Sequence, residues 1–306
     1  MTTTRPVDDG TPPIDIRRLT KRFGPLTAVD TLDLTVGSGE IYGLLGPNGA
    51  GKSTTIRALM GFVNATSGTA GLLGGTARDL RLRSRVGYVG GDVVLDRGLR
   101  AQHLLNWYAD LRGGVDPDAV DALCRRLSLD TDRKIGELST GNRKKVAIVQ
   151  AFMHRPDVLV LDEPTVGLDP LLQREVLNLV RERRADGCAV LFSSHLLPEV
   201  EDIADRVGIL REGVLVREDT IASLREEARQ RLELRFSDDV APDLLDGVDG
   251  VASAEVDGHT VHVVVDGSVA PLLRRVADRG VDRIVSHDED LEDIFFDYYQ
   301  ADGGAR

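Results

Sequence analysis

Nine residues near the start of the chain have the types and spacing of a phosphate-binding loop. They fit the Walker A pattern G-x-x-x-x-G-K-[ST] and read Gly46-Pro47-Asn48-Gly49-Ala50-Gly51-Lys52-Ser53-Thr54. The glycines let the backbone curl so that successive N–H groups point at phosphate oxygens. Lys52 would neutralise the β- and γ-phosphates, and the Ser53 hydroxyl would ligate Mg²⁺. The loop therefore predicts a nucleoside triphosphate site with Mg²⁺ as cofactor.

A second set of polar residues follows two apolar runs. Asp162-Glu163 comes directly after residues 158–161, and His195 follows residues 188–192 and two serines. Continuous apolar runs are typical of strands buried on both faces, and α/β sheets bind ligands at the carboxyl ends of such strands. We therefore expect Asp162 to hold Mg²⁺, Glu163 to polarise the attacking water as a general base, and His195 to contact the γ-phosphate. The alternatives are a helix cap or a surface charge for the acidic pair, and a structural role for the histidine.

The elements that must position these residues indicate an α/β fold. Residues 40–45 predict a strand before the loop, and residues 53–60 predict the helix after it. Predicted helices at 171–184 and 198–205 alternate with the apolar strands, which is typical of a parallel sheet covered on both faces.

Four further segments add layers to this sheet. Residues 14–20 and 28–36 alternate apolar and polar side chains, which predicts an antiparallel β layer joined to the core. Residues 100–112 and 117–127 carry apolar residues at helical spacing and lie between two predicted strands. They predict an inserted helical layer.

The composition changes after about Glu227, and a second domain is expected there. Its predicted strands are 232–236, 251–256, 260–265 and 282–286, and its predicted helices are 241–245, 269–279 and 291–299. The order β-α-β-β-α-β is that of a ferredoxin-like split βαβ unit. We expect residues 1–13 to be disordered, residues 14–226 to bind the nucleotide, and residues 227–306 to form an accessory or regulatory α+β domain.

Length and charge limit the function classes. A chain of 306 residues suggests about two domains of ~150 residues each. The net charge of −12 argues against a nucleic acid partner, for which a basic face is expected. Cys124 and Cys188 lie far apart, as buried thiols do in a reducing compartment. There is no signal-peptide pattern and no apolar stretch of ~18 residues, so we expect a soluble, intracellular protein.

Residues 14–226 resemble the ATP-binding cassette of ABC transporters, with the motifs in family order. Leu138-Ser139-Thr140-Gly141-Asn142 resembles the signature Leu-Ser-Gly-Gly-Gln and differs from it at the third and fifth positions. Asp162-Glu163 resembles the Walker B pair, Val166-Gly167-Leu168-Asp169 the D-loop, and His195 the switch histidine. Phe23 stands where the family keeps an aromatic residue under the adenine, although a core aromatic is the alternative at that position.

The resemblance implies that ATP is shared between two copies of the chain. Ser139 and Gly141 stand at a predicted helix N-terminus, which suits an anion. In the family, the signature of one subunit closes on the ATP held by the other, so Ser139, Gly141, Asn142 and Asp169 would contact the second copy's nucleotide. A two-fold, head-to-tail homodimer is the simplest way for a single cassette to supply both halves.

One departure from the family concerns the Q-loop. The family carries a glutamine or glutamate after the strand that here is residues 86–89, and this chain has Gly90-Gly91-Asp92. Gly91 has no side chain, so Asp92 is the candidate substitute as a metal ligand. We expect Asp92→Ala to slow coupled transport more than ATP binding.

The resemblance also implies a function. A single cassette followed by a domain that ends in residues 291–295 is similar to drug- and antibiotic-exporter ATPases of the daunorubicin-resistance type, which work with a separate membrane permease. It implies an ATPase that powers export of a drug-like, antibiotic or lipid-like substrate. Such a subunit lies in the cytoplasm, at the inner face of the cell membrane, where the permease holds it.

Three alternatives belong to other classes. A soluble ABC ATPase acting on ribosomes or DNA usually has two cassettes with a charged linker, or a long coiled coil, and neither is present. A P-loop GTPase or kinase would not explain the motif at residues 138–142, and the guanine-reading Asn-Lys-x-Asp motif is absent. An ATP-dependent regulator whose C-terminal domain senses a ligand stays open.

Overall fold

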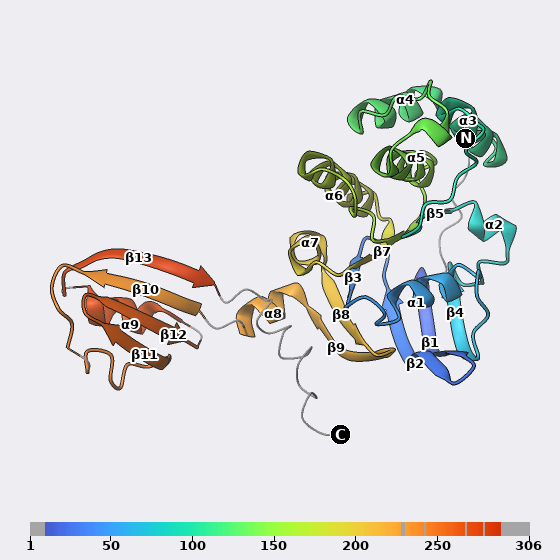
Figure 1. Cartoon of the computed structure of the whole chain (residues 1–306). Helices are drawn as coiled ribbons and strands as arrows, with labels where there is room; N and C mark the ends of the chain where they lie inside the picture. Colours follow the sequence, from blue (N-terminus) through green and yellow to red (C-terminus); the bar gives the residue numbers. More distant parts are fainter. Residues whose placement is uncertain (1–9, 228–229, 242, 267, 278, 289–306) are drawn as a thin grey trace. The chain divides into compact units, whose positions relative to one another are not determined.

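The computed structural model describes residues 10–227, 230–241, 243–266, 268–277 and 279–288 (Figure 1). The chain divides into two compact units, one up to Glu218 and one from Asp219 onward. The division falls within β9 (Val214–Thr220), somewhat before the boundary expected after residue 226. Each unit has its own sheets and its own core.

A six-stranded sheet forms the centre of the first unit. Its strand order is β5-β6-β7-β3-β8-β9. The strands besides β9 are β3 (Ile41–Leu45), β5 (Val86–Val89), β6 (Val158–Asp162), β7 (Ala189–Ser194) and β8 (Arg206–Arg211). The four pairs from β5 to β8 are parallel. Every residue of β3, β6 and β7 is buried, because these central strands are covered on both faces, as their apolar runs predict.

An antiparallel sheet packs against this core through α1 (Lys52–Leu59). Its order is β2-β1-β4, with β1 (Ile14–Phe23), β2 (Leu26–Val36) and β4 (Ser67–Leu72). Ile56 and Leu59 of α1 share one buried cluster with residues of both sheets. The predicted antiparallel layer is confirmed. β1 continues to Phe23, beyond the segment expected at 14–20, and the chain reverses at Gly24, where φ is 57°.

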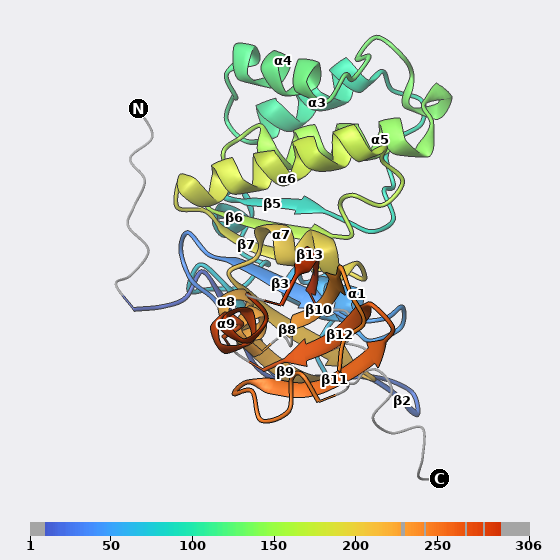
Figure 2. The ribbon, with the colours of Figure 1, turned by 90° about the vertical axis from the view of Figure 1, so that its left-hand side faces the viewer.

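Helices cover the opposite face of the central sheet. They are α5 (Thr140–Phe152), α6 (Pro170–Ala185) and α7 (Leu197–Ile203). Figure 2 shows α3 (Ala101–Leu111) and α4 (Pro117–Arg126) on the side of α5 and α6 that faces away from the sheet. These two helices form the inserted helical layer that the sequence predicts. Two shorter helical segments were not predicted, α2 (Leu80–Arg83) and the 3₁₀ turn Ile135–Glu137.

The second unit contains a four-stranded antiparallel sheet in the order β11-β12-β10-β13. Its elements are α8 (Ile221–Glu227), β10 (Gln230–Phe236), β11 (Val251–Asp257), β12 (Thr260–Val265), α9 (Ala270–Val276) and β13 (Val281–Asp288). Leu234, Val261 and Val265 of the sheet pack with Leu272 of α9 in its core.

One predicted helix of this unit is wrong. The stretch expected to be helical at 241–245 contains turns, in which the Leu244 N–H donates to the Ala241 carbonyl at 3.0 Å. The segment ends at Gly247, where φ is 70°, so it is too short to offset the cost of helix nucleation. The predicted helix at 291–299 and residues 1–9 of the predicted disordered terminus lie outside the described residues.

Candidate active site

Three strand ends meet at one edge of the central sheet. In the parallel register, Leu45 of β3 pairs with Ser194 of β7, and Asp162 of β6 pairs with Ser193 of β7. The phosphate-binding loop follows β3, the acidic pair ends β6, and His195 follows β7. Strand pairing therefore brings together groups that are more than a hundred residues apart in the sequence.

The loop after β3 passes very close to neighbouring backbone. A Cβ atom on Gly46 would lie 2.3 Å from the Leu210 carbonyl oxygen. Gly51 has φ of 110°, and a Cβ there would lie 2.4 Å from the Ala28 carbonyl oxygen. Only glycine fits these two positions. The loop is thus fixed against β8 and β2 before α1 begins at Lys52.

Lys52 is the cation of the site. Its side chain is only 5% exposed, and its ammonium donates to the carbonyl oxygen of Gly46 and, at 3.2 Å, to that of Pro47. The same nitrogen lies 3.4 Å from Oε1 of Glu163. The Lys52 ammonium therefore contacts both the phosphate-binding loop and Glu163.

A cavity of about 480 Å³ opens at this edge of the sheet, within the first unit. It is lined by Phe23, Leu26, Ala28, Pro47, Asn48, Gly49, Ala50, Gly51, Lys52, Ser53, Thr54, Gly91, Glu163, Val166 and His195. The size is that of a small-molecule site, and the lining holds the loop, a base and an imidazole. Apart from Gly46, which lies just before it, the predicted phosphate-binding loop lines the cavity.

Asp162 lies beneath this cavity with one oxygen fixed and one oxygen free. Its Oδ1 accepts a hydrogen bond from the Ser193 hydroxyl at 2.7 Å. Its Oδ2 is buried and has no hydrogen-bond partner in the part of the chain that the structure describes. A buried, unpaired carboxylate oxygen is costly, and a bound cation removes that cost. Asp162 and Ser53 thus fit the few protein ligands that Mg²⁺ takes beside phosphates and water. Within the described ranges, no cluster of three His, Cys, Asp or Glu side chains could bind a metal by itself.

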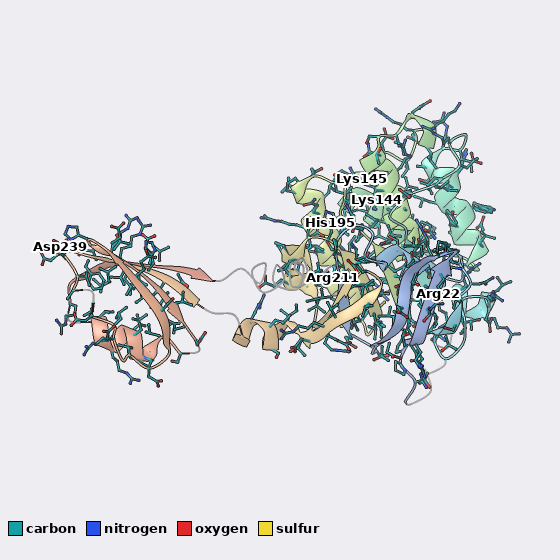
Figure 3. All side chains as sticks on the ribbon, turned by 60° about the horizontal axis from the view of Figure 1, so that its bottom comes forward. Arg22, Lys144, Lys145, His195, Arg211 and Asp239 are labelled. Carbon is teal, nitrogen blue, oxygen red and sulfur yellow. The ribbon has the colours of Figure 1, made fainter. Side chains whose placement is uncertain are left out.

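Glu163 and His195 form a contact pair at the cavity wall. Nδ1 of His195 lies 2.5 Å from Oε2 of Glu163, and His195 is marked in Figure 3. Glu163 has φ of 50°, a strained value for a residue with a side chain, and its N–H donates to the Ser193 carbonyl at 3.1 Å. Such strain is typical of functional positions. The turn directs Glu163 toward the cavity, whereas Asp162 points under it.

Phe23 lies at the cavity wall and not in the core. It is 48% exposed, at the end of β1, and the Lys21 ammonium lies 4.6 Å from its ring centroid. Leu26 and Ala28 of β2 line the same part of the wall. An exposed ring beside a cavity can stack on a base.

The signature residues and Asp169 of the D-loop do not line this cavity, although Val166 of the D-loop does. Ser139 caps the N-terminus of α5 and accepts from the Asn142 N–H at 3.2 Å. Asp169 caps α6 and accepts from the Leu172 N–H at 3.1 Å. A Cβ on Gly141 would lie 2.8 Å from the Gly167 carbonyl oxygen, so the signature packs directly on the D-loop. Ser139, Gly141, Asn142 and Asp169 are therefore not part of the cavity lining of their own chain.

The structure does not bring Asp92 to the cavity. Its side chain is 93% exposed, and its carboxylate lies 4.0 Å from the Arg57 guanidinium. Position 91 faces the site instead, since Gly91 lines the cavity and a Cβ on it would lie 3.4 Å from Oδ2 of Asp162. The chain turns between residues 90 and 92, so the side chain one residue further on points to solvent.

Several site residues were missed by sequence reasoning. Ser193 orients Asp162, and Leu26, Ala28 and Val166 line the cavity. A serine directly after an apolar run was the signal for Ser193. That signal becomes specific only once β6 and β7 are known to be neighbours.

Comparisons with known proteins find ABC transporter ATP-binding proteins. The family model described as ABC transporter matches residues 29–166. The chain is 33% identical over 291 residues to the bacitracin transport ATP-binding protein BcrA of Enterococcus faecalis, covering 92% of this chain and 94% of that protein. It is 34% identical over 294 residues to the Nod factor export ATP-binding protein I of Burkholderia lata, covering 92% of this chain and 95% of that protein.

Solved structures give the same fold. An ATP-binding subunit of an ABC transporter matches with a TM-score of 0.65 and 28% identity, covering 69% of this chain and 91% of that chain. A dimeric bacterial ABC transporter cassette matches in fold with a TM-score of 0.62 and 21% identity, covering 68% of this chain and 98% of that chain. Among the described residues, no helix is long and apolar enough to cross a bilayer.

Proposed function

The chain belongs to the family of ABC transporter ATP-binding proteins, and from that premise we propose that it is the ATPase subunit that powers export through a separate membrane permease. The observation that carries this proposal is the convergence of Lys52, Asp162, Glu163 and His195 around one cavity. The ribosome- or DNA-acting alternative is not favoured, since relatives that match 92% of the chain are named for transport and export. A GTPase or kinase is not favoured by the family match.

The loop after β3 would bind ATP. The backbone N–H groups of residues 48–52 and the N-terminal end of α1 would hold the phosphates, and Lys52 would exchange its bonds to Gly46 and Pro47 for phosphate oxygens. Phe23 would stack on the adenine, with Leu26 and Ala28 beside it.

Asp162 and Ser53 would hold Mg²⁺. The free Oδ2 of Asp162 and the Ser53 hydroxyl are the two protein ligands, and the Ser193 hydroxyl keeps the carboxylate in that orientation. When bound, the cation neutralises charge on the phosphate oxygens.

Glu163 would act as the general base for hydrolysis. Its carboxylate accepts the proton of the attacking water, and His195, at 2.5 Å from Oε2, orients it. Lys52 now lies 3.4 Å from Oε1, so transfer of Lys52 to the phosphates frees that oxygen for the water.

A second copy of the chain would complete the site. Ser139, Gly141, Asn142 and Asp169 do not line the cavity of their own chain, so they would be available to the nucleotide of a partner copy. We place the dimer at the inner face of the cell membrane, bound to the permease. The permease would select a drug-like, antibiotic or lipid-like cargo.

Purified protein tests the enzymatic part of this proposal. Glu163→Gln should retain ATP binding and lose hydrolysis by at least ~10²-fold, the usual contribution of a general base. Lys52→Ala should lose ATP affinity because it removes the charge that neutralises the phosphates. A Glu163→Gln variant that hydrolyses ATP at the wild-type rate would overturn the role of Glu163.

Co-purification from native membranes tests the partner. We expect a protein with several membrane spans to be recovered with the chain. Recovery with ribosomes or DNA, and without a membrane protein, would support the soluble alternative instead.

A further inference from the structure

Lys144 is a buried lysine on α5 that the proposed mechanism leaves unused. It is 4% exposed, and its ammonium lies 3.4 Å from the carbonyl oxygens of both Gly90 and Gly91. A buried ammonium needs such acceptors to offset its lost hydration. The two contacts connect α5 to the segment that follows β5.

That segment forms the wall of the ATP cavity beside the metal ligand. Gly91 lines the cavity, and a Cβ on it would lie 3.4 Å from Oδ2 of Asp162, the buried oxygen without a partner. Burial lowers the pKa of Lys144, and the carboxylates of Asp162 and Glu163 act on it in the opposite direction. Lys144 therefore lies within electrostatic reach of both acidic residues of the site.

Gly90 and Gly91 have no side chains with which to anchor this wall. Glycine has more backbone freedom than any other residue, so two in succession are held only through their backbone groups. The Lys144 ammonium contacts the backbone carbonyl oxygens of both glycines.

We propose that Lys144 is a positioning residue that fixes the Gly90–Gly91 backbone against Asp162. This inference rests on the proposed ATPase function. It assigns Lys144 as the residue that orders the ATP site at position 91, where there is no side chain. In this proposal, α5 contributes to two ATP sites. The helix begins at the signature, which would meet the ATP of the second copy, and four residues further on it holds the wall of its own ATP cavity.

The chain offers a matched control in the next residue. Lys145 is also buried, at 8% exposed, and its ammonium donates to a backbone carbonyl, that of Ser128, at 3.3 Å. Both lysines are on α5, as labelled in Figure 3, but Ser128 follows α4 in the helical layer and is not part of the cavity. Loss of Lys145 reproduces the structural cost without the proposed effect on the site.

Hydrogen–deuterium exchange of the full chain without nucleotide tests the positioning directly. In Lys144→Met, we expect the amides of residues 90–92 to exchange on the order of tenfold faster than in wild type, the size expected from loss of a charge-assisted hydrogen bond. In Lys145→Met they should exchange as in wild type. If Lys144→Met does not fold, Lys144→Gln is measured against the same criterion.

Steady-state hydrolysis by the same variants gives the second measurement. Lys144→Met should lower kcat on the order of tenfold, with KM for ATP within about twofold, because the phosphate-binding loop is unaffected. Equal exchange at residues 90–92 in both lysine variants, or equal kcat values, would each overturn the inference. A wild-type chain that hydrolyses no ATP would contradict the proposed function, while the exchange measurement would still test the positioning.

Discussion

Asp162 and Glu163 are adjacent carboxylates whose surroundings give them different tasks. Asp162 is 1% exposed, and the Ser193 hydroxyl fixes one of its oxygens. Glu163 is 15% exposed at its side chain and lies between Lys52 and His195. The left-handed φ of Glu163 turns the chain directly after β6, which separates the two side chains. One carboxylate is therefore placed to hold a cation and the other to meet water.

The exposed ring of Phe23 should contribute to ATP affinity. Phe23→Ala should raise the Kd for ATP about tenfold, because stacking on a base contributes on the order of 1–3 kcal/mol. The kcat should stay within about twofold, since loss of the ring leaves Lys52 and Glu163 in place. Equilibrium binding of ATP and of inorganic tripolyphosphate measures this. Tripolyphosphate, which has no base, should bind both proteins equally, and Phe23→Tyr should behave as wild type. Unchanged ATP affinity would remove Phe23 from the site.

For single residues, the sequence predicted the roles that depend only on neighbouring residues in the chain. The phosphate-binding loop is a contiguous pattern between a strand and a helix, so Lys52 and Ser53 could be assigned directly. The bond from Ser193 to Asp162 could not, because it depends on which strands are neighbours. Asp92 carries the carboxylate next to position 91, but the direction of its side chain depends on a turn that the sequence does not specify.

Among the elements, α4 and α6 are joined by one arginine. Arg126 lies in the last turn of α4, and its guanidinium donates to both carboxylate oxygens of Glu182 on α6, each at 2.7 Å. Its Nε also donates to Glu175 of α6. Bidentate pairing of this kind has favourable geometry and ties the inserted helical layer to the sheet-covering layer.

Loss of this arginine should weaken the first unit in a salt-dependent way. Arg126→Met should lower the free energy of unfolding by about 1 kcal/mol at low ionic strength, and by less at high salt, because the pair is partly exposed and screened. Urea denaturation at two salt concentrations measures the difference. Arg133→Met is the control, because Arg133 pairs with exposed Asp130, three residues away in the sequence. An equal loss of unfolding free energy in both variants would show that the connection between α4 and α6 does not contribute to stability.

Elements were predicted well where their pattern was continuous or repeated over several turns. The uninterrupted apolar runs of β6 and β7 and the periodic stripes of α3 and α4 are such patterns, and the structure confirms these elements. The helix expected at 241–245 failed because five residues before a glycine turn are too few for their propensity to decide.

For the whole molecule, a half-buried histidine links stability to pH. His154 lies at the end of the α5 region, and both ring nitrogens are buried without a hydrogen-bond partner among the described residues. Burial, with the nearby charges of Arg112 and Arg183, lowers the pKa of His154 to about 3. The unfolded chain takes up this proton near pH 6.5, so the stability held by neutral His154 is complete above that pH and is lost as the pH falls toward 3.

The acid sensitivity should therefore depend on this side chain. Between pH 7 and pH 5, wild type should lose about 2 kcal/mol more of its free energy of unfolding than His154→Leu, which cannot be protonated. Urea denaturation followed by the fluorescence of Trp107, the single tryptophan, reports on the unit that contains His154. His103→Leu, an exposed position on α3, should follow wild type. Parallel pH profiles for wild type and His154→Leu would contradict the assignment.

We expect each ATP site to take residues from two copies of the chain. Lys52→Ala disables the phosphate-binding loop. Ser139→Asp keeps a good N-cap for α5 but sets a negative charge where the signature would face phosphate. Each variant alone should be inactive, since every site in its homodimer carries the defect.

Mixing the two variants tests this claim most directly. In a head-to-tail dimer, a mixed pair has one site with both defects and one site with none, so hydrolysis should return to as much as about a quarter of the wild-type rate. If each chain formed its whole site alone, both variants would stay inactive in the mixture. ATP hydrolysis by the mixture that is no higher than the sum of the separate variants would contradict the account.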